Sequence, residues 1–220
     1  EATGLATLDA LMRFEGGQAF RDVPGRSTVR TDLEALDGDH VAVYIKRHRR
    51  VPMRLKLRRL ISFGEPTSAA TTEARNIVRV MDLGIPAMRI VDFDEAFEAG
   101  GVRERSCLVT EEVPGATQAD DFCQTRYAEA DDAATIREKR RLVRAIARLA
   151  RRLHAGGLVH RDFYLCHVLV RPRDEADPIL HLIDLQRVRR AEGWRADRWI
   201  VKDLAAMLFS SWPSEATGIG

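Results

Sequence analysis

A long amphipathic segment that runs into a polar island limits what this chain can fold into. Residues 134–155 carry apolar side chains at helical spacing, namely Leu142, Ile146, Leu149 and Leu153. The pair Gly156-Gly157 is typical of the end of such a helix. His160, Arg161 and Asp162 then lie in a row between two apolar runs. Such an island is either the surface of a short loop or a reaction centre, and the rest of the sequence decides between them.

The first half of the chain is rich in strand-like runs, whereas the second half is mainly helical. The strand-like runs are residues 27–36, 41–46, 87–97 and 105–113. We expect one helix among them, capped by Thr71 or Thr72 and ending at Gly84. Beyond the long helix we expect short strands at 167–171 and 180–185, with Cys166 packed in the core just before them, and a last helix at 198–210. In that helix we expect Trp199, Leu204 and Leu208 to be buried and Asp203 to hydrogen-bond the loop that carries the polar island. The sequence therefore predicts a two-lobed α+β fold with a β-rich N-lobe (1–113) and a mainly helical C-lobe (114–220).

Five polar residues stand in the order in which a kinase uses such groups. A kinase holds the ATP phosphates with a strand lysine that a helix glutamate orients, a loop aspartate accepts the proton of the acceptor hydroxyl, and further ligands hold magnesium. Lys46 ends a strand, and Glu73 lies on the next helix. Asp162 lies in the polar island, and His167 and Asp184 stand where metal ligands belong. This order predicts an ATP- and Mg²⁺-dependent phosphotransferase.

The segment before Pro114 and Gly115 completes the pattern, because we expect the backbone at Glu111 and Val113 to form the hinge that holds the adenine of ATP. Each residue alone has a simpler explanation: a strand-end lysine is usually a surface residue, and Asp184 would equally cap a turn. Five matches in order, each on the expected type of element, favour a kinase fold. The alternative to an active kinase is a protein-kinase-like fold that has lost its catalytic activity.

The stretch HRDFYLCHVLV, with IDLQR after it and RWIVKDLAAMLFSS near the end, resembles the lipopolysaccharide core heptose kinase family. These bacterial enzymes are related to protein kinases, which lack the Tyr164-x-Cys166-His167 signature. The resemblance spans residues 25–211. It implies that Asp162 is the catalytic base and that the γ-phosphoryl group of ATP goes to a sugar hydroxyl of the lipopolysaccharide inner core, expected to be a heptose.

The role of His167 stays open, and the chain departs from the family pattern. Magnesium prefers oxygen ligands to imidazole, so His167 would bind either the metal with Asp184 or a phosphate. The chain has no glycine-rich loop before the first hairpin, where only Gly25 marks a turn. Gln186 stands where the family tends to have histidine.

Two basic segments indicate an anionic partner, although the net charge is only +2. Residues 46–59 contain almost no acid and residues 137–152 are nearly as basic, which suits phosphate or acidic lipid. A solvated helix face is an equal alternative for 137–152. Nucleic acid is disfavoured because no aromatic stacking platform accompanies the charge. We expect the lipopolysaccharide core or a lipid-linked phosphosaccharide, and an anionic membrane surface, as partners.

The sequence also indicates a cellular location. No apolar run approaches the roughly 20 residues that span a bilayer, and the three cysteines match no disulfide or zinc framework. We expect a cytoplasmic protein, peripheral on the inner face of the inner membrane. Acyl carrier protein is expected as a partner from the family resemblance alone.

Two other functions compete with this interpretation. One is a protein or small-metabolite kinase of the same fold, such as one resembling the aminoglycoside phosphotransferases, and His167 argues against it because those enzymes usually have asparagine there. The other is a non-catalytic nucleotide-binding scaffold. The scaffold is disfavoured because the residues that pseudokinases lose are all present: Lys46, Glu73, Asp162 and Asp184.

Overall fold

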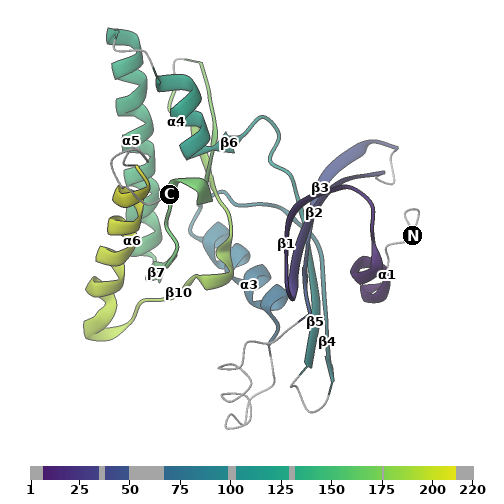
Figure 1. Ribbon diagram of the computed structural model, residues 1–220. Coiled ribbons are helices and arrows are strands. Elements are labelled where there is room, and N and C mark those ends of the chain that lie inside the picture. Colours follow the sequence, from purple (N-terminus) through teal and green to yellow (C-terminus); the bar gives the residue numbers. More distant parts are fainter. Residues whose placement is uncertain are drawn as a thin grey trace. The chain divides into compact units, whose positions relative to one another are not determined.

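The computed structural model shown in Figure 1 describes residues 7–34, 38–49, 67–98, 103–128, 132–174 and 176–211. The chain forms two compact units. Unit 1 comprises residues 1–75 and 88–112, and unit 2 comprises residues 76–87 and 113–220. The predicted α+β class is confirmed, whereas the predicted lobe boundaries stay a prediction. Most of the basic segment 46–59 lies outside the described residues.

Unit 1 is built on a five-stranded antiparallel sheet in the order β1-β2-β3-β5-β4. Its strands are β1 (Gln18–Val23), β2 (Arg26–Glu34), β3 (His40–His48), β4 (Ile90–Glu98) and β5 (Arg103–Glu111). The predicted hairpin is confirmed, because β2 and β3 pair along their whole length, with Thr28 opposite Lys46. Gly25 lies in the two-residue turn between β1 and β2 and has a φ of 87°, a left-handed conformation that glycine adopts without strain.

The core of unit 1 lies between one face of this sheet and helix α1 (Leu8–Arg13). Alternate residues of β3 and β5 point into it, as the two-residue period of a strand requires. The buried side chains are Leu8, Leu11, Met12, Val43, Ile45, Cys107 and Val109. Lys46 follows Ile45 in β3, so its side chain leaves the sheet on the opposite face from this core.

Helix α3 (Ala69–Asp82) begins earlier than predicted. Neither Thr71 nor Thr72 is its cap: the Oγ of Ser68 accepts a hydrogen bond from the Thr71 N–H at 3.0 Å, and both threonines lie inside the first turn. Serine is a better N-cap than threonine, and Ser68 directly precedes the helix. Gly84, with a φ of 68°, follows the helix end as predicted.

Unit 2 combines helices with two small sheets. The helices are the second half of α3, α4 (Ala119–Tyr127), α5 (Ala133–Ala155) and α6 (Ala196–Ser210). One sheet has the order β6 (Thr117–Gln118), β8 (Val168–Arg171), β9 (Ile179–Leu182), and the other pairs β7 (Leu158–Val159) with β10 (Arg189–Arg190). The predicted helical face of α5 is confirmed by the burial of Leu142, Leu149 and Leu153. No helix of the described residues is long and apolar enough to cross a membrane.

The second half of α3 groups with unit 2 through specific hydrogen bonds. The side-chain amide of Asn76 donates to the carbonyls of Leu185 and Val188 at 2.8 and 3.0 Å. The Leu182 N–H donates to the Pro86 carbonyl at 2.9 Å. The Asn76 bonds join α3 to the segment that follows β9 and carries Asp184, and the Pro86 bond joins the residues after α3 to β9 itself.

The prediction that Leu204 and Leu208 are core residues of α6 is wrong. They are 47% and 63% exposed, and Trp199 is only half-buried. The inward-facing residue is Asp203, which is 1% exposed. Hydropathy alone favours burial of the two leucines. The hydrogen bonds that Asp203 makes with the loop beneath it instead determine which face of the helix turns inward.

Candidate active site

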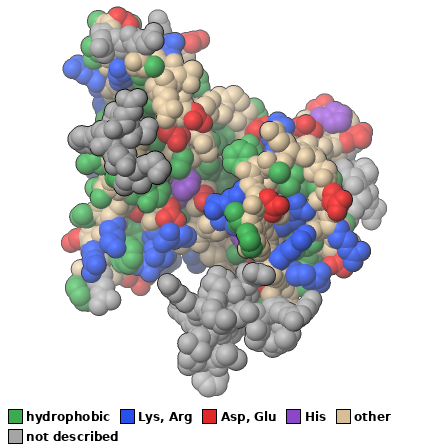
Figure 2. Space-filling view, in the orientation of Figure 1, with side chains coloured by type: hydrophobic (Ala, Val, Ile, Leu, Met, Phe, Trp, Pro, Cys, Tyr) green, Lys and Arg blue, Asp and Glu red, His purple; other side chains and the backbone are tan. Residues whose placement is uncertain are grey.

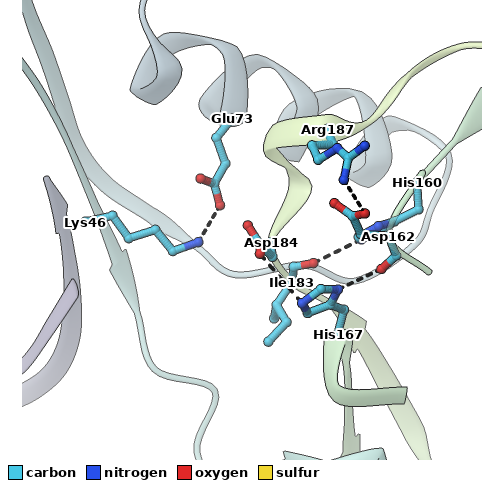
Figure 3. A network of polar contacts seen from close by, with 8 residues as sticks. All are labelled: Lys46, Glu73, His160, Asp162, His167, Ile183, Asp184 and Arg187. Carbon is cyan, nitrogen blue, oxygen red and sulfur yellow. Dashed lines mark hydrogen bonds and ion pairs between the residues drawn. The ribbon is translucent and has the colours of Figure 1, made fainter. Parts of the chain in front are cut away.

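Lys46 and Glu73 form a buried ion pair in unit 1. The Nζ of Lys46 lies 2.5 Å from the Oε1 of Glu73, and the side chains are 13% and 0% exposed (Figure 3). The other glutamate oxygen, Oε2, has no hydrogen-bond partner among the described residues. A cation held in this way is suited to bind an anion such as a phosphate. Lys46 does not end its strand as predicted, because β3 continues to His48.

Two carboxylates from the sheet fix the first turn of α3, the helix that carries Glu73. Glu95 accepts hydrogen bonds from the Ser68 N–H at 3.0 Å and from the Thr71 hydroxyl at 2.6 Å. Glu104 accepts from the Ala69 N–H at 2.7 Å. Negative charge at the start of a helix is favourable because the first amides there lack partners within the helix. These bonds hold Glu73 in place opposite Lys46.

The loop that follows β7, which we call the catalytic loop (residues 160–167), is anchored to helix α6. The Asp203 carboxylate accepts hydrogen bonds from the N–H groups of His160 and Arg161, both at 2.7 Å. This anchoring confirms the sequence-based expectation for Asp203. Arg161 adopts a φ of 74°, which is unusual for a residue with a side chain. The loop is thus held in a conformation that its own residues do not favour.

His160 braces the catalytic loop from inside. It is fully buried, and its Nε2 donates to the Ile183 carbonyl at 3.0 Å, since a carbonyl can only accept. The loop is thereby linked to the residue before Asp184. Phe163 and Leu165 fill the core beneath the loop, so the prediction that Cys166 is the packed residue is wrong; Cys166 is half-buried.

Asp162, His167 and Asp184 lie together in unit 2 (Figure 3). The Nδ1 of His167 donates to the Asp162 carbonyl at 2.7 Å, which leaves the Nε2 of a neutral ring with a free electron pair. That Nε2 lies 3.6 Å from the Oδ2 of Asp184, too far for a hydrogen bond. Two electron-pair donors that face each other at this distance suit a cation, and a histidine that binds metal commonly donates its other N–H to a carbonyl.

The donor set fits magnesium better than it fits a fully protein-ligated metal. No group of three or more His, Cys, Asp or Glu residues in the described part of the chain could hold a metal ion. Magnesium usually takes one or two protein ligands and completes its shell with water and substrate phosphates. Asp184 and His167 would supply such a partial set.

Sequence reasoning missed Arg187 as a residue of this site. Its Nη1 donates to the Oδ1 of Asp162 at 2.6 Å. The Oδ2 of Asp162 has no hydrogen bond with another described residue, so it can accept a proton from a substrate. Arg187 is visible in the motif IDLQR, but its contact with Asp162 joins residues 25 positions apart.

The expected hinge residues fall in different units: Glu111 belongs to unit 1 and Val113 to unit 2. The Glu111 N–H donates to the Arg89 carbonyl at 2.9 Å, and its carboxylate pairs with the Arg89 side chain. The Val113 carbonyl accepts from the Ala116 N–H at 3.3 Å. Between them, Glu112 binds Arg30 at 2.6 Å, and this arginine lowers the pKa of the Glu112 carboxyl. An adenine-binding role for Glu111 and Val113 stays a prediction.

We expect Asp203→Asn to destabilise the protein by about 1–3 kcal/mol, because one of two buried N–H groups would lose its acceptor and face an amide instead. The unfolding temperature should then fall by roughly 2–10 °C. Asp197→Asn, on the exposed side of the same helix, is the matched control and should change it far less. Equal unfolding temperatures for the two variants would contradict the anchoring role of Asp203.

Acid should destabilise the protein through two buried histidines. Burial lowers the pKa of both His160 and His48 below the ordinary histidine value of 6.5. The unfolded chain therefore binds protons near pH 6.5 that the folded protein does not, and stability falls as the pH drops below that value. His160→Gln keeps an N–H donor but cannot titrate, so its unfolding temperature should fall less than the wild type's between pH 7.5 and 5. The exposed His40→Gln is the control, and an identical fall in all three proteins would refute this expectation.

Several known proteins are similar to this chain in sequence and in structure. The model of the family described as lipopolysaccharide kinase (Kdo/WaaP) matches residues 13–218. The lipopolysaccharide core heptose(I) kinase WaaP of Escherichia coli K12 is 30% identical over 199 residues, which cover 89% of this chain and 71% of that protein. The WaaP of Pseudomonas aeruginosa PAO1 is 32% identical over 198 residues, covering 89% of this chain and 70% of that protein. A solved structure of WaaP in complex with acyl carrier protein matches with a TM-score of 0.68 at 31% identity, over 93% of this chain and 74% of the other.

Proposed function

The chain belongs to the lipopolysaccharide kinase (Kdo/WaaP) family, and on this premise we propose that it transfers the γ-phosphoryl group of ATP to a heptose hydroxyl of the lipopolysaccharide inner core. The relatives named above are kinases of this substrate. The observation in this chain that best supports the proposal is the Oδ2 of Asp162, which makes no hydrogen bond with another described residue, on a carboxylate that Arg187 holds in position.

Asp162 would act as the catalytic base. Its Oδ2 would accept a hydrogen bond from the attacking hydroxyl and take the proton as the new bond to phosphorus forms. Arg187 fixes the carboxylate through Oδ1 without occupying the second oxygen. Because Asp203 and His160 hold the loop at residues 160 and 161, directly before Asp162, the Asp162 carboxylate would not need to reorganise during the reaction.

Lys46 would bind the phosphates of ATP, with Glu73 holding the ammonium group in place. Asp184 and His167 would hold Mg²⁺, which when bound neutralises charge on the phosphates. The hydrogen bond from His167 to the Asp162 carbonyl supports a metal role for the histidine, because in a neutral ring it leaves the electron pair on Nε2. The backbone at Glu111 and Val113 would contact the adenine.

The experiment is phosphate transfer from radiolabelled ATP, with Mg²⁺, to lipopolysaccharide whose inner-core heptose lacks phosphate. Label on the heptose would support the proposal. Acceptors for the competing functions, a generic protein substrate and an aminoglycoside, are included in parallel. Transfer to either of these and not to lipopolysaccharide would replace the proposed substrate, and ATP binding without any transfer would favour the scaffold.

We also propose that the protein is peripheral on the cytoplasmic face of the inner membrane, where its acceptor would be reached. Helix α5 supports this with an exposed row of arginines on the face opposite its buried leucines: Arg137, Arg140, Arg144 and Arg151. None of the four forms an ion pair with a described residue. Arg140→Gln/Arg144→Gln should weaken co-sedimentation with phosphatidylglycerol vesicles at low salt, and unchanged co-sedimentation would argue against membrane contact by this helix.

Acyl carrier protein is a further proposed partner, supported by the solved relative that is complexed with it. Co-elution of the two purified proteins in size-exclusion chromatography tests this, and separate elution at micromolar concentrations would count against it.

A further inference from the structure

A cluster of cations surrounds one tryptophan beside the catalytic loop, and the proposed reaction does not use it. Trp199 of α6 has three cations over its ring: the guanidinium of Arg189 at 3.9 Å from the ring centroid, and Arg161 and Lys202 each at 4.9 Å. All of them belong to unit 2. Cation–π contact with the indole ring holds the positive groups in place but does not neutralise their charge.

A cavity of about 530 Å³ opens over this cluster. Four basic side chains line it, namely Arg189, Arg190, Arg198 and Lys202. The one acidic residue in its wall is Glu192, which lies 3.9 Å from Arg190. Figure 2 shows Lys and Arg side chains gathered on the part of unit 2 that holds β10 and the start of α6.

The charge of this cluster is not compensated within the described residues. None of Arg161, Arg189, Arg198 and Lys202 forms an ion pair with a described carboxylate. The Nε of Arg161 is buried and has no hydrogen-bond partner among the described residues. Burial and the neighbouring cations Arg189 and Arg187 lower the pKa of Arg161. Grouped, partly desolvated cations are unfavourable unless an anion joins them.

The cluster lies next to Asp162, so an anion that it binds would belong to the acceptor. Arg161 directly precedes Asp162, and Arg187, which binds the Asp162 carboxylate at 2.6 Å, lies two residues before Arg189. The cluster therefore adjoins the residue that would take the proton of the acceptor hydroxyl. Arginine pairs well with carboxylate and phosphate because its planar fork matches two of their oxygens.

We propose that Arg161, Arg189, Arg198 and Lys202 around Trp199 form a subsite for an acidic group, a carboxylate or a phosphate, of the saccharide acceptor. The assignment to the acceptor rests on the proposed kinase function, whereas anion binding by the cluster does not. The subsite would select acidic saccharides over neutral ones and hold the acceptor with its hydroxyl at Asp162.

The first test measures anion binding without turnover. Inorganic phosphate is titrated into the full chain while tryptophan fluorescence is recorded, with a non-hydrolysable ATP analogue and Mg²⁺ at saturation to fill the nucleotide site. Arg189→Gln/Lys202→Gln should raise the Kd for phosphate roughly tenfold or more, as expected when charge-assisted hydrogen bonds are lost. Arg171→Gln/Arg173→Gln removes the same charge from exposed positions of unit 2 and should leave the Kd unchanged.

The second test measures steady-state kinetics with lipopolysaccharide acceptors. The cluster variant should raise the acceptor KM at least about tenfold and leave the KM for ATP within about twofold. Carboxyl-reduced and dephosphorylated acceptors are compared separately, and the modification that removes the difference between variant and wild type identifies the acidic group. Should the double variant unfold early, Lys202→Gln alone, at an exposed position of α6, should shift the acceptor KM in the same direction.

The outcomes separate the subsite from the kinase function. Phosphate binding that is equal in the cluster variant and the control overturns the anion site. Weakened phosphate binding with an unchanged acceptor KM overturns the assignment to the acceptor. If the wild type transfers phosphate to no lipopolysaccharide, the proposed function and the acceptor assignment fail together, and the phosphate titration still decides whether the cluster binds an anion.

Discussion

Asparagine in place of Asp162 is expected to lower the rate of phosphoryl transfer roughly 10²- to 10⁴-fold, the usual contribution of a general base. The amide keeps the size of the side chain and an oxygen that can accept from Arg187, so the fold should persist. It cannot take the hydroxyl proton. We therefore expect kcat to fall while the KM for ATP changes little, as measured by initial rates over a range of ATP concentrations.

Asp177→Asn is the matched control for this variant. Asp177 is an exposed aspartate of unit 2 that also pairs with an arginine, Arg148, at 2.5 Å. Its replacement removes the same charge and the same kind of contact, and we expect a kcat within about twofold of the wild type, because surface ion pairs contribute little. Equal rates in the Asp162 and Asp177 variants would exclude Asp162 as the base, whatever the acceptor.

Lys46→Met is expected to destabilise unit 1 by about 3–5 kcal/mol, because it leaves the fully buried Glu73 carboxylate without its cation. The same substitution should abolish detectable ATP turnover if Lys46 binds the phosphates. The midpoint of urea denaturation measures the stability, and initial rates measure the turnover.

The double variant Lys46→Met/Glu73→Leu separates these two effects. Removing both charges leaves an apolar pair, so much of the lost stability should return while turnover stays absent. Arg89→Met is the control, because it breaks the more exposed ion pair with Glu111 and should cost less than about 1 kcal/mol. A double variant no more stable than Lys46→Met, or one that regains activity, would contradict this account of the pair.

Local patterns explain why much of the architecture was predictable. The β2–β3 hairpin, the long helix α5 and the short strands β8 and β9 all follow from alternation or helical spacing within a few residues. Errors arose where several capping residues stand close together, as with Ser68 and Thr71 at the start of α3, or where hydropathy was the only guide, as with Leu204 and Leu208 in α6.

In the candidate site, too, some contacts could be predicted from the sequence and others could not. Lys46 and Glu73 were paired from their order in the chain, and the structure places them in contact. Arg187 and the cations around Trp199 were not foreseen, because their contacts join segments that no local pattern links.

By itself the sequence determined the class of fold, the order of its elements and which polar residues are candidates for chemistry, because periodicity and motif spacing are properties of neighbouring residues. Only the tertiary structure decided which face of α6 turns inward, that Arg187 holds one oxygen of Asp162, and that three cations converge on Trp199. Each of these depends on side chains far apart in sequence meeting in a particular orientation. Packing of whole elements sets that orientation, and no stretch of the sequence encodes it alone.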